Sequence, residues 1–181
     1  MALVVLLRGV NVGGHRTFRP SLVAQQLRRF DVVNVGAAGT FVVRKPVSQV
    51  TFRAALRGLL PFDTDVMICP GSELLRLSKG SLFAGEPLAS DVVPFVSMLA
   101  RRSQPSSPLP VRFPPTGAWG LRLIAQQGRF VVGVYRREMR AIAHLSQIDR
   151  LYGVPATTRN LNTILAIARV LEAPVRRRSD P

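Results

Sequence analysis

The order of apolar segments in residues 1–71 most limits the folds open to this chain. Four segments have the length and composition of strands: residues 2–7, 31–35, 40–45 and 66–69. Two helical patterns lie between these strands. The first begins at Pro20 and places Leu22 on its buried face, and the second is ended by Pro61 and places Val50 on its buried face. The resulting order, β-α-β-β-α-β, is ferredoxin-like, a sheet with two helices on one face.

A connector and a second part are expected to follow. Residues 72–90 should form a short helix and a loop. The second part, residues 91–181, has strand patterns at 92–100 and in a hairpin at 118–136, and then two C-terminal helical patterns. Pro94 predicts an edge strand or a bulge, because proline donates no ladder hydrogen bond. The predicted fold class is α+β, with a ferredoxin-like first part and a mixed, β-rich second part.

The chain is strongly basic. Its 25 lysine and arginine residues against 10 acidic residues give a formal net charge of +15. A surface of this kind attracts polyanions by electrostatic steering and by releasing counterions from phosphates. Background composition spread over a solvated surface would give the same numbers, so the charge alone leaves both interpretations open.

Neither membrane insertion nor an internal disulfide is expected. The N-terminal apolar run covers six residues before Arg8, whereas a membrane-spanning helix needs about 20. The charged start and cleavage site of a secretory signal are missing as well. The single cysteine, Cys69, fits a reducing compartment. The sequence therefore predicts a cytoplasmic protein and says nothing of its oligomeric state.

The polar segment RGVNVGGH, residues 8–15, follows the first predicted strand. Gly13 and Gly14 permit positive φ and close backbone approach, so their N–H groups would face an anion, with Arg8 and Asn11 beside them. The alternative is a tight strand-to-helix connection in which Asn11 hydrogen-bonds its own backbone. Because the lysine and hydroxyl of the P-loop pattern are missing, the paired glycines do not identify a phosphate loop.

The polar segment ATTRNLNT, residues 156–163, precedes the last helical pattern. Thr157, Thr158 or Asn160 would cap that helix. Arg159 would then lie at the positive end of the helix dipole, where an anionic ligand or an acidic partner would offset the mismatch. The alternative is ordinary capping, with Arg159 facing solvent or paired with an acid.

The pairing of RGVNVGG near the N-terminus with TTRNLNT near the C-terminus resembles the bacterial family catalogued as domain of unknown function 1697. Residues 73–87, ELLRLSKGSLFAGEP, are similar to its mid-chain helix and following loop, so the likeness spans nearly the whole chain. The chain departs from the family at residues 37–40, AAGT, where the family carries a serine-glycine-asparagine turn. The resemblance implies a ferredoxin-like first part, a second α+β part and no established activity.

The leading functional hypothesis is binding of a small anionic or phosphorylated ligand in a cleft between the two parts. Arginines would supply charge, glycine and helix-end amides would donate hydrogen bonds, and asparagines would fix orientation. The predicted ligand-binding residues are Arg8, Asn11, Gly13, Gly14, Thr158, Arg159, Asn160 and Asn162.

Two other functions remain open. Non-specific nucleic-acid binding would use an arginine-rich surface, with candidates Arg101, Arg102, Arg136, Arg137, Arg140 and residues 176–178. The aromatic platform of an RNA-recognition module is missing, since the first and third strands offer Phe41 alone. An enzyme acting on a phosphoester is the other alternative, although no catalytic constellation is recognisable. Two histidines and one cysteine complete no zinc site, so neither a metal nor a cofactor is expected.

Overall fold

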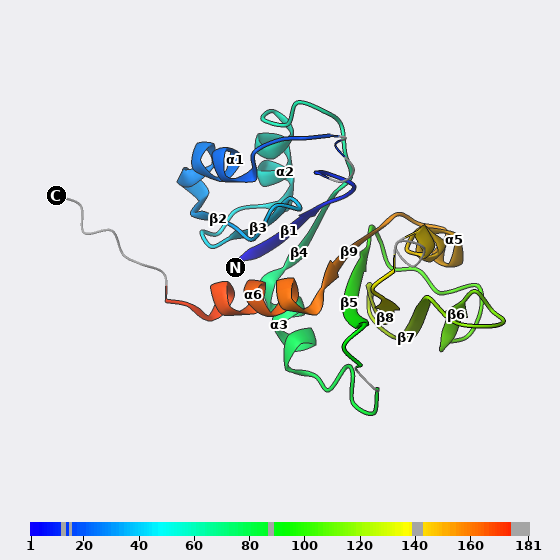
Figure 1. Ribbon diagram of the computed structural model, residues 1–181. Coiled ribbons are helices and arrows are strands. Elements are labelled where there is room, and N and C mark those ends of the chain that lie inside the picture. The colour runs from blue at the N-terminus through cyan, green and yellow to red at the C-terminus, as the bar shows by residue number, and fades with distance from the viewer. Residues whose placement is uncertain (12–13, 15, 87–88, 139–142, 175–181) are drawn as a thin grey trace. The chain divides into compact units, whose positions relative to one another are not determined.

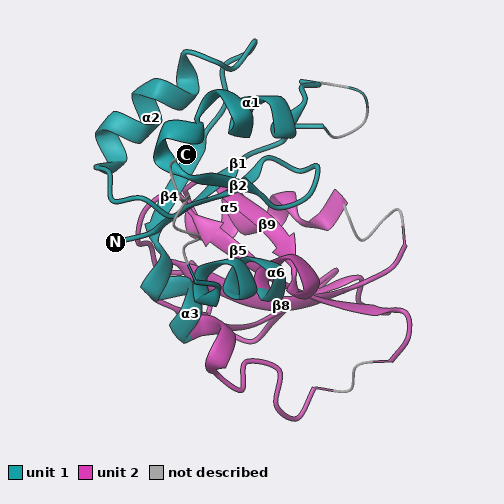
Figure 2. Ribbon diagram, turned by 90° about the vertical axis from the view of Figure 1, so that its left-hand side faces the viewer, with its two compact units in different colours: residues 1–76, 165–181 teal, residues 77–164 magenta. Residues whose placement is uncertain are grey.

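The computed structural model describes residues 1–11, 14, 16–86, 89–138 and 143–174. The chain divides into two compact units (Figure 2): unit 1, residues 1–76 and 165–181, and unit 2, residues 77–164. Each unit contains an antiparallel sheet together with helices (Figure 1), so the predicted α+β class is confirmed. In the described part of the chain, no helix has the length and apolar character that crossing a membrane requires.

Unit 1 is built on a four-stranded sheet. Its elements follow the predicted order: β1 (Leu3–Leu7), α1 (Pro20–Gln26), the 3-10 helix η1 (Arg28–Phe30), β2 (Val32–Asn34), β3 (Thr40–Val43), α2 (Gln49–Arg57), β4 (Val66–Pro70) and then α3 (Gly71–Lys79). The sheet order is β2-β3-β1-β4, with each neighbouring pair antiparallel. Strands β1 and β2 therefore run in the same direction with β3 between them, which is compatible with the predicted ferredoxin-like arrangement.

Helices α1 and α2 pack on one face of this sheet. Val23 and Leu27 from the first helix region and Phe52 and Leu56 from the second share a core with alternate strand residues such as Val5. All five residues of β1 are buried, so this strand has no solvent-facing side. A continuous apolar run is what a strand buried on both faces needs, which explains why its sequence does not alternate.

Two residues predicted to be buried on these helices face solvent. Leu22 in α1 is 50% exposed and Val50 in α2 is 79% exposed. The buried residues of α2 are Phe52 and Leu56, which lie four positions apart and therefore on one face. Val50 is two positions from Phe52, a rotation of about 200° around the helix. The prediction followed the aliphatic residues and overlooked Phe52 as the core residue.

The turn between β2 and β3 requires glycine at position 39. Gly39 has a φ of +65°, and a Cβ built there would lie 2.8 Å from Leu7 Cβ and 2.7 Å from Val10 Cγ2. Its carbonyl accepts a hydrogen bond of 2.8 Å from the Leu7 N–H. Gly36, in the same turn, also has a positive φ but has open space around it. The end of β1 thus packs directly against the backbone of this turn.

Unit 2 contains a five-stranded sheet in the order β6-β7-β8-β5-β9. Its elements are β5 (Val92–Leu99), β6 (Val111–Phe113), β7 (Leu121–Gln127), β8 (Phe130–Arg136), α5 (Ser146–Tyr152) and β9 (Ala156–Asn160). The next helix, α6 (Leu161–Glu172), begins in unit 2 and belongs to unit 1 from residue 165 onward. The predicted hairpin is confirmed as β7 and β8, with Gly128 at a φ of 62° in its turn. Ile148 and Leu151 of α5 pack on a core that includes Leu121 and Leu123.

Pro94 does not lie on an edge strand, because β5 pairs with β8 on one side and with β9 on the other. Pairing with β9 begins one residue later, where Phe95 is opposite Asn160, while Pro94 itself is opposite Val134 of β8. One flank of Pro94 therefore has no neighbouring strand. A proline is accommodated in a central strand at such a locally open position.

Unit 2 repeats the strand order of unit 1. Strands β5, β7, β8 and β9 take the sheet positions that β1, β2, β3 and β4 take in the first sheet. In both cases one helix precedes the last strand and another follows that strand at once in the chain, although α6, the helix after β9, lies mostly in unit 1. The connection from β5 to β7 carries β6 where unit 1 has α1. The repeat concerns topology alone, since the aligned strands share little beyond apolar character.

Replacing Gly39 with alanine should lower the free energy of unfolding by about 2–5 kcal/mol. The positive φ accounts for about 1–2 kcal/mol, and the contacts with Leu7 and Val10 add about 1–3 kcal/mol of overpacking. Gly36→Ala is the matched control, because Gly36 has a similar φ but lacks the close contacts. This variant should lose only about 1–2 kcal/mol, the cost of the positive φ. Urea unfolding of both variants measures the difference, and equal losses would show that the packing against β1 is not what selects glycine.

We expect the protein to lose stability at high pH because of Tyr152. Its hydroxyl is buried and forms no hydrogen bond within the described residues, and burial raises its pKa from 10.0 to about 12. Between these values the unfolded chain releases the phenol proton while the folded chain keeps it, so stability falls as pH rises. Tyr152→Phe should match or exceed the wild type in Tm at pH 7 and lose less Tm between pH 9 and 11. A steeper loss in the variant would contradict this.

Candidate functional site

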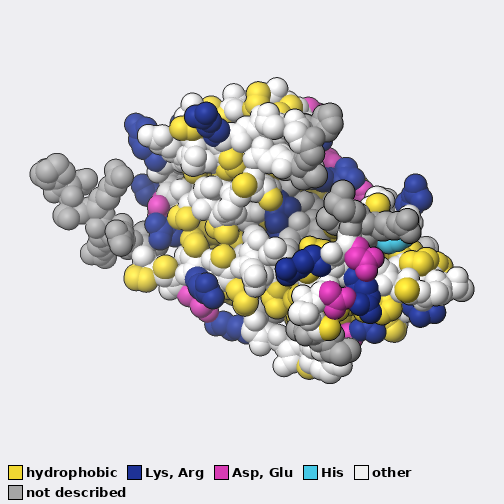
Figure 3. All heavy atoms as spheres, viewed as in Figure 1, with side chains coloured by type: hydrophobic (Ala, Val, Ile, Leu, Met, Phe, Trp, Pro, Cys, Tyr) yellow, Lys and Arg dark blue, Asp and Glu magenta, His cyan; other side chains and the backbone are white. Residues whose placement is uncertain are grey.

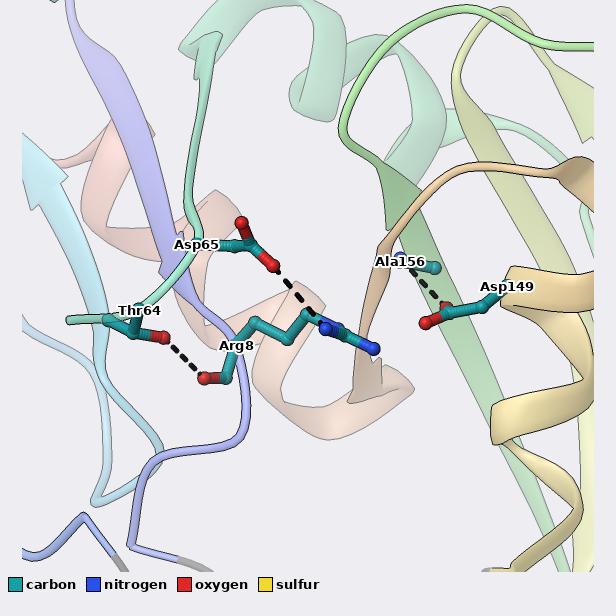
Figure 4. Close-up of polar contacts among 5 residues, drawn as sticks. All are labelled: Arg8, Thr64, Asp65, Asp149 and Ala156. Carbon is teal, nitrogen blue, oxygen red and sulfur yellow. Dashed lines mark hydrogen bonds and ion pairs between the residues drawn. The ribbon is translucent and has the colours of Figure 1, made fainter.

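The segment that contains Arg8 forms the connection from β1 to α1 in unit 1. One guanidinium nitrogen of Arg8 lies 3.3 Å from Asp65 Oδ2 (Figure 4), and the two side chains are 41% and 50% exposed. The Arg8 carbonyl accepts a hydrogen bond of 2.6 Å from the Thr64 hydroxyl. An exposed ion pair of this kind adds little stability, but Asp65 does balance the charge of Arg8.

Asn11 ties the β1–α1 connection together. Its side-chain amide donates to the Phe18 carbonyl at 3.2 Å and to the Ala37 carbonyl at 2.7 Å, and its Oδ1 accepts from the Phe18 N–H at 2.9 Å. Its φ of 53° lies in the left-handed region, which asparagine tolerates. In the alternative drawn from sequence Asn11 bonds its own backbone, whereas these partners lie at Phe18 and at Ala37 in the β2–β3 turn.

Of the two predicted glycines, Gly13 lies outside the described residues. Gly14 is exposed, has a φ of +77° and has no atom within 4 Å of a Cβ built on it. Its conformation is one that glycine adopts freely and other residues rarely do. The space beside its backbone is therefore open, as an approaching ligand would need.

A hollow of about 340 Å³ in unit 1 does not include the predicted residues. It is lined by Arg57, Leu60, Pro61, Phe62, Asp63 and Thr64. Its charged residues have opposite signs, so it offers no clear preference for an anion. Among the residues that the structure describes, no three histidine, cysteine, aspartate or glutamate side chains gather as metal ligands would.

The second predicted segment is mainly a strand, β9. Thr157 and Thr158 were expected as helix caps, but both are paired with β5, and the Thr158 hydroxyl lies 2.6 Å from that of Ser97. β-branched residues suit a pleated, half-buried strand, and here pairing with β5 prevails over capping. Asn160, the remaining candidate, does cap α6, because its Oδ1 accepts from the Thr163 N–H at 2.9 Å.

Arg159 is the one charged residue in the described part of the chain that is buried, with 7% of its surface exposed. Its NH1 nitrogen donates to Thr157 Oγ1 at 3.1 Å and to the Thr158 carbonyl at 2.8 Å. Both acceptors are neutral. Desolvation by burial lowers the pKa of Arg159 to about 10, which still leaves it charged at pH 7. The alternative in which Arg159 faces solvent is therefore wrong.

The junction between β9 and α6, residues 157–162, is held at both ends. Ahead of it, Asp149 Oδ1 accepts from the Ala156 N–H at 2.9 Å (Figure 4). Behind it, Asn160 caps the helix, and the side chain of Asn162 in the first turn is exposed. The junction therefore joins a buried cation on a paired strand to the positive end of a helix dipole.

One of the arginines proposed for nucleic acid, Arg136, has structural partners in unit 2. It pairs with Asp91, and its guanidinium carbon lies 4.7 Å from the centre of the Trp119 ring. Arg122, which was not among those candidates, pairs with Glu86 and lies 5.2 Å from the same ring. On the face drawn in Figure 3, Lys and Arg side chains lie at several separate places. The other candidates include some outside the described residues, namely Arg140 and residues 176–178.

The comparisons with known proteins support the fold and give no activity. No protein-family model matches the chain, and no curated protein sequence does. Among solved structures, the chain is similar to the conserved bacterial protein SP0830 from Streptococcus pneumoniae, with 15% sequence identity and a TM-score of 0.57, over 94% of this chain and 98% of that chain. At this identity the likeness shows the fold, which extends over nearly the full length.

Asn11→Asp should lower the free energy of unfolding by about 2–4 kcal/mol. Aspartate keeps the size, the tolerance of positive φ and the acceptor for the Phe18 N–H, but it loses both donors and places a carboxylate against two carbonyls. Asp65→Asn, which removes the exposed ion pair with Arg8, is the control and should cost less than about 1 kcal/mol. Urea unfolding measures both, and equal costs would contradict the structural role of Asn11.

Proposed function

We propose that the protein binds a small anionic or phosphorylated ligand at the β9–α6 junction. The observation that carries the proposal is the position of Arg159, a buried cation, on a strand that leads directly into the N-terminus of α6. The guanidinium charge attracts an anion to this junction. The backbone N–H groups in the first turn of α6 and the dipole of this helix also favour a negatively charged ligand.

The residues of the junction divide into a frame and a binding group. Thr158, bonded to Ser97, and Asn160, bonded to Thr163, form the frame. Arg159 supplies the charge and the planar donor arrangement that suits phosphate and carboxylate oxygens. Asn162, whose side chain is exposed, supplies an amide that orients the ligand.

The β1–α1 connection of unit 1 is a weaker candidate for anion binding. Asp65 balances the charge of Arg8, and the side chain of Asn11 makes three hydrogen bonds to backbone groups. Gly14 retains open space beside it. These contacts favour a mainly structural role for RGVNVGGH.

We also propose that the chain belongs to the family catalogued as domain of unknown function 1697. The support is the pair of motifs RGVNVGG and TTRNLNT. A cytoplasmic location belongs to the same proposal, supported by the single cysteine. An alignment of homologues tests family membership: Asn11, Arg159 and Asn160 should recur at equivalent positions, and their free variation would contradict it.

A thermal-shift titration with inorganic phosphate and with nucleotides tests the proposed function. A ligand at about 100 times its Kd adds about 2.7 kcal/mol of stability, which corresponds to a rise of roughly 5–10 °C in Tm for a chain of this size. Asn162→Ala should keep the Tm of the free protein and reduce this rise. Gln104→Ala removes an exposed amide elsewhere in unit 2 and should leave the rise unchanged.

The outcomes separate the function from its site. If no anion raises the Tm of the wild type, the protein does not bind small anions and the proposal fails. If an anion raises the Tm of Asn162→Ala and of the wild type equally, the ligand binds elsewhere.

A further inference from the structure

The first 62 residues of the chain are almost free of acidic side chains. They contain one acid, Asp31, against nine basic residues: Arg8, Arg16, Arg19, Arg28, Arg29, Arg44, Lys45, Arg53 and Arg57. Asp31 makes a two-point contact with Arg44, at 2.9 Å between Nε and Oδ2 and 3.0 Å between the terminal nitrogen and Oδ1. The charge of this acid is therefore balanced by its immediate partner and does not offset the other cations.

Three of these cations gather at one corner of unit 1. Arg28 and Arg29 belong to η1, Lys45 follows β3, and all three are exposed. The Lys45 N–H donates to the Phe30 carbonyl at 3.2 Å, and the Arg44 N–H donates to the Asp31 carbonyl at 3.1 Å. These backbone bonds hold the two segments side by side. We refer to Arg28, Arg29 and Lys45 as the basic corner.

The basic corner is anchored to the core. The guanidinium carbon of Arg29 lies 4.7 Å from the centre of the Phe30 ring. That ring packs edge-on against Phe52 of α2, with 5.6 Å between ring centres. The backbone that carries these charges is therefore fixed by packing, so less conformational entropy is lost when the corner binds a partner.

We infer that the basic corner binds the phosphate backbone of nucleic acid without sequence preference. Clustered exposed cations complement a polyanion and gain from counterion release. Asp31, the one acid among residues 1–62, is already paired with Arg44. The corner has no open platform for bases, since the Phe30 ring contacts Arg29 and Phe52 and the ring of Phe41 is fully buried. Phosphate contacts alone position a protein on nucleic acid but read no sequence.

A lipid surface fits the corner less well. Binding to a bilayer interface needs a broad apolar face beside the cations. The large hydrophobic residues that are exposed in the described part of the chain are Met1, Leu22 and Val50. Three residues are too few for a broad apolar face, so phosphate charge is the better match. The surface lies in unit 1 and is independent of the small-ligand site proposed in unit 2.

Fluorescence anisotropy with a labelled DNA duplex of about 20 base pairs and an RNA strand of similar length tests this inference. The triple variant Arg28→Ser, Arg29→Ser, Lys45→Ser should bind both probes more weakly in low salt. If three phosphate contacts are lost, the log–log salt slope falls by about 2.7. Raising salt from 50 to 200 mM should then weaken the wild type roughly 40-fold more than the variant.

The matched control removes the same charge from exposed positions of unit 2 that were not candidates for nucleic-acid binding, as Lys79→Ser, Arg112→Ser, Arg150→Ser. It should keep most of the wild-type salt slope, and an equal loss in both variants would assign binding to net charge and overturn the inference. A double variant, Arg28→Ser and Lys45→Ser, leaves the Arg29–Phe30 contact in place. It replaces the triple variant in this test if the triple variant has a lower Tm than the wild type.

Two other results would also overturn the inference. One is the absence of binding to either probe at 50 mM salt. The other is capture of the wild type by phosphatidylserine vesicles without binding to nucleic acid, which would make a membrane the partner. A phosphate-induced rise in Tm with no nucleic-acid binding would leave the β9–α6 proposal standing and reject the basic corner alone.

Discussion

Pairing of the first strand on both of its edges is the constraint on which each unit depends. In unit 1, β1 lies between β3 and β4, and in unit 2, β5 lies between β8 and β9. Because β1 and β5 come first in their units, both sheet neighbours of each come from later in the chain, and in each unit one of these neighbours is the last strand. This pairing brings the polar segment Ala156–Asn160 into the sheet and buries Arg159 there. The burial of a cation is thus a consequence of the strand order, and this cation is the group on which the proposed anion site depends.

Most of the polar residues in the two motifs have structural partners. Asn11 joins backbone groups on both sides of a loop, Thr158 pairs with Ser97 across two strands, and Asn160 caps a helix. Buried or half-buried polar groups need such hydrogen bonds, because a buried group without a partner destabilises the fold by more than a satisfied hydrogen bond stabilises it. Arg159 differs from these residues because it carries a charge at a buried position. The proposed anion site therefore centres on this one side chain.

The fold was largely predictable, while the roles of the polar residues were less so. The continuous apolar run of β1, the glycine turns and the β7–β8 hairpin are local signals, and they placed these elements correctly. The β9 strand could not be predicted from local pattern, because Thr-Thr-Arg-Asn is also a typical helix start, and pairing with β5 decides between the two. The bond from Asn11 to Ala37 spans 26 positions in sequence, so it is visible only once the fold is known.

The most direct test of the central claim is NMR of the arginine side-chain Nε–H groups during titration with inorganic phosphate or a nucleotide. Arg159 should give one slowly exchanging resonance, assigned by its disappearance in Arg159→Lys, because its guanidinium is buried. We expect this resonance to shift and to saturate while those of exposed arginines move little. A titration in which the exposed arginines respond and the Arg159 resonance stays fixed would contradict the account.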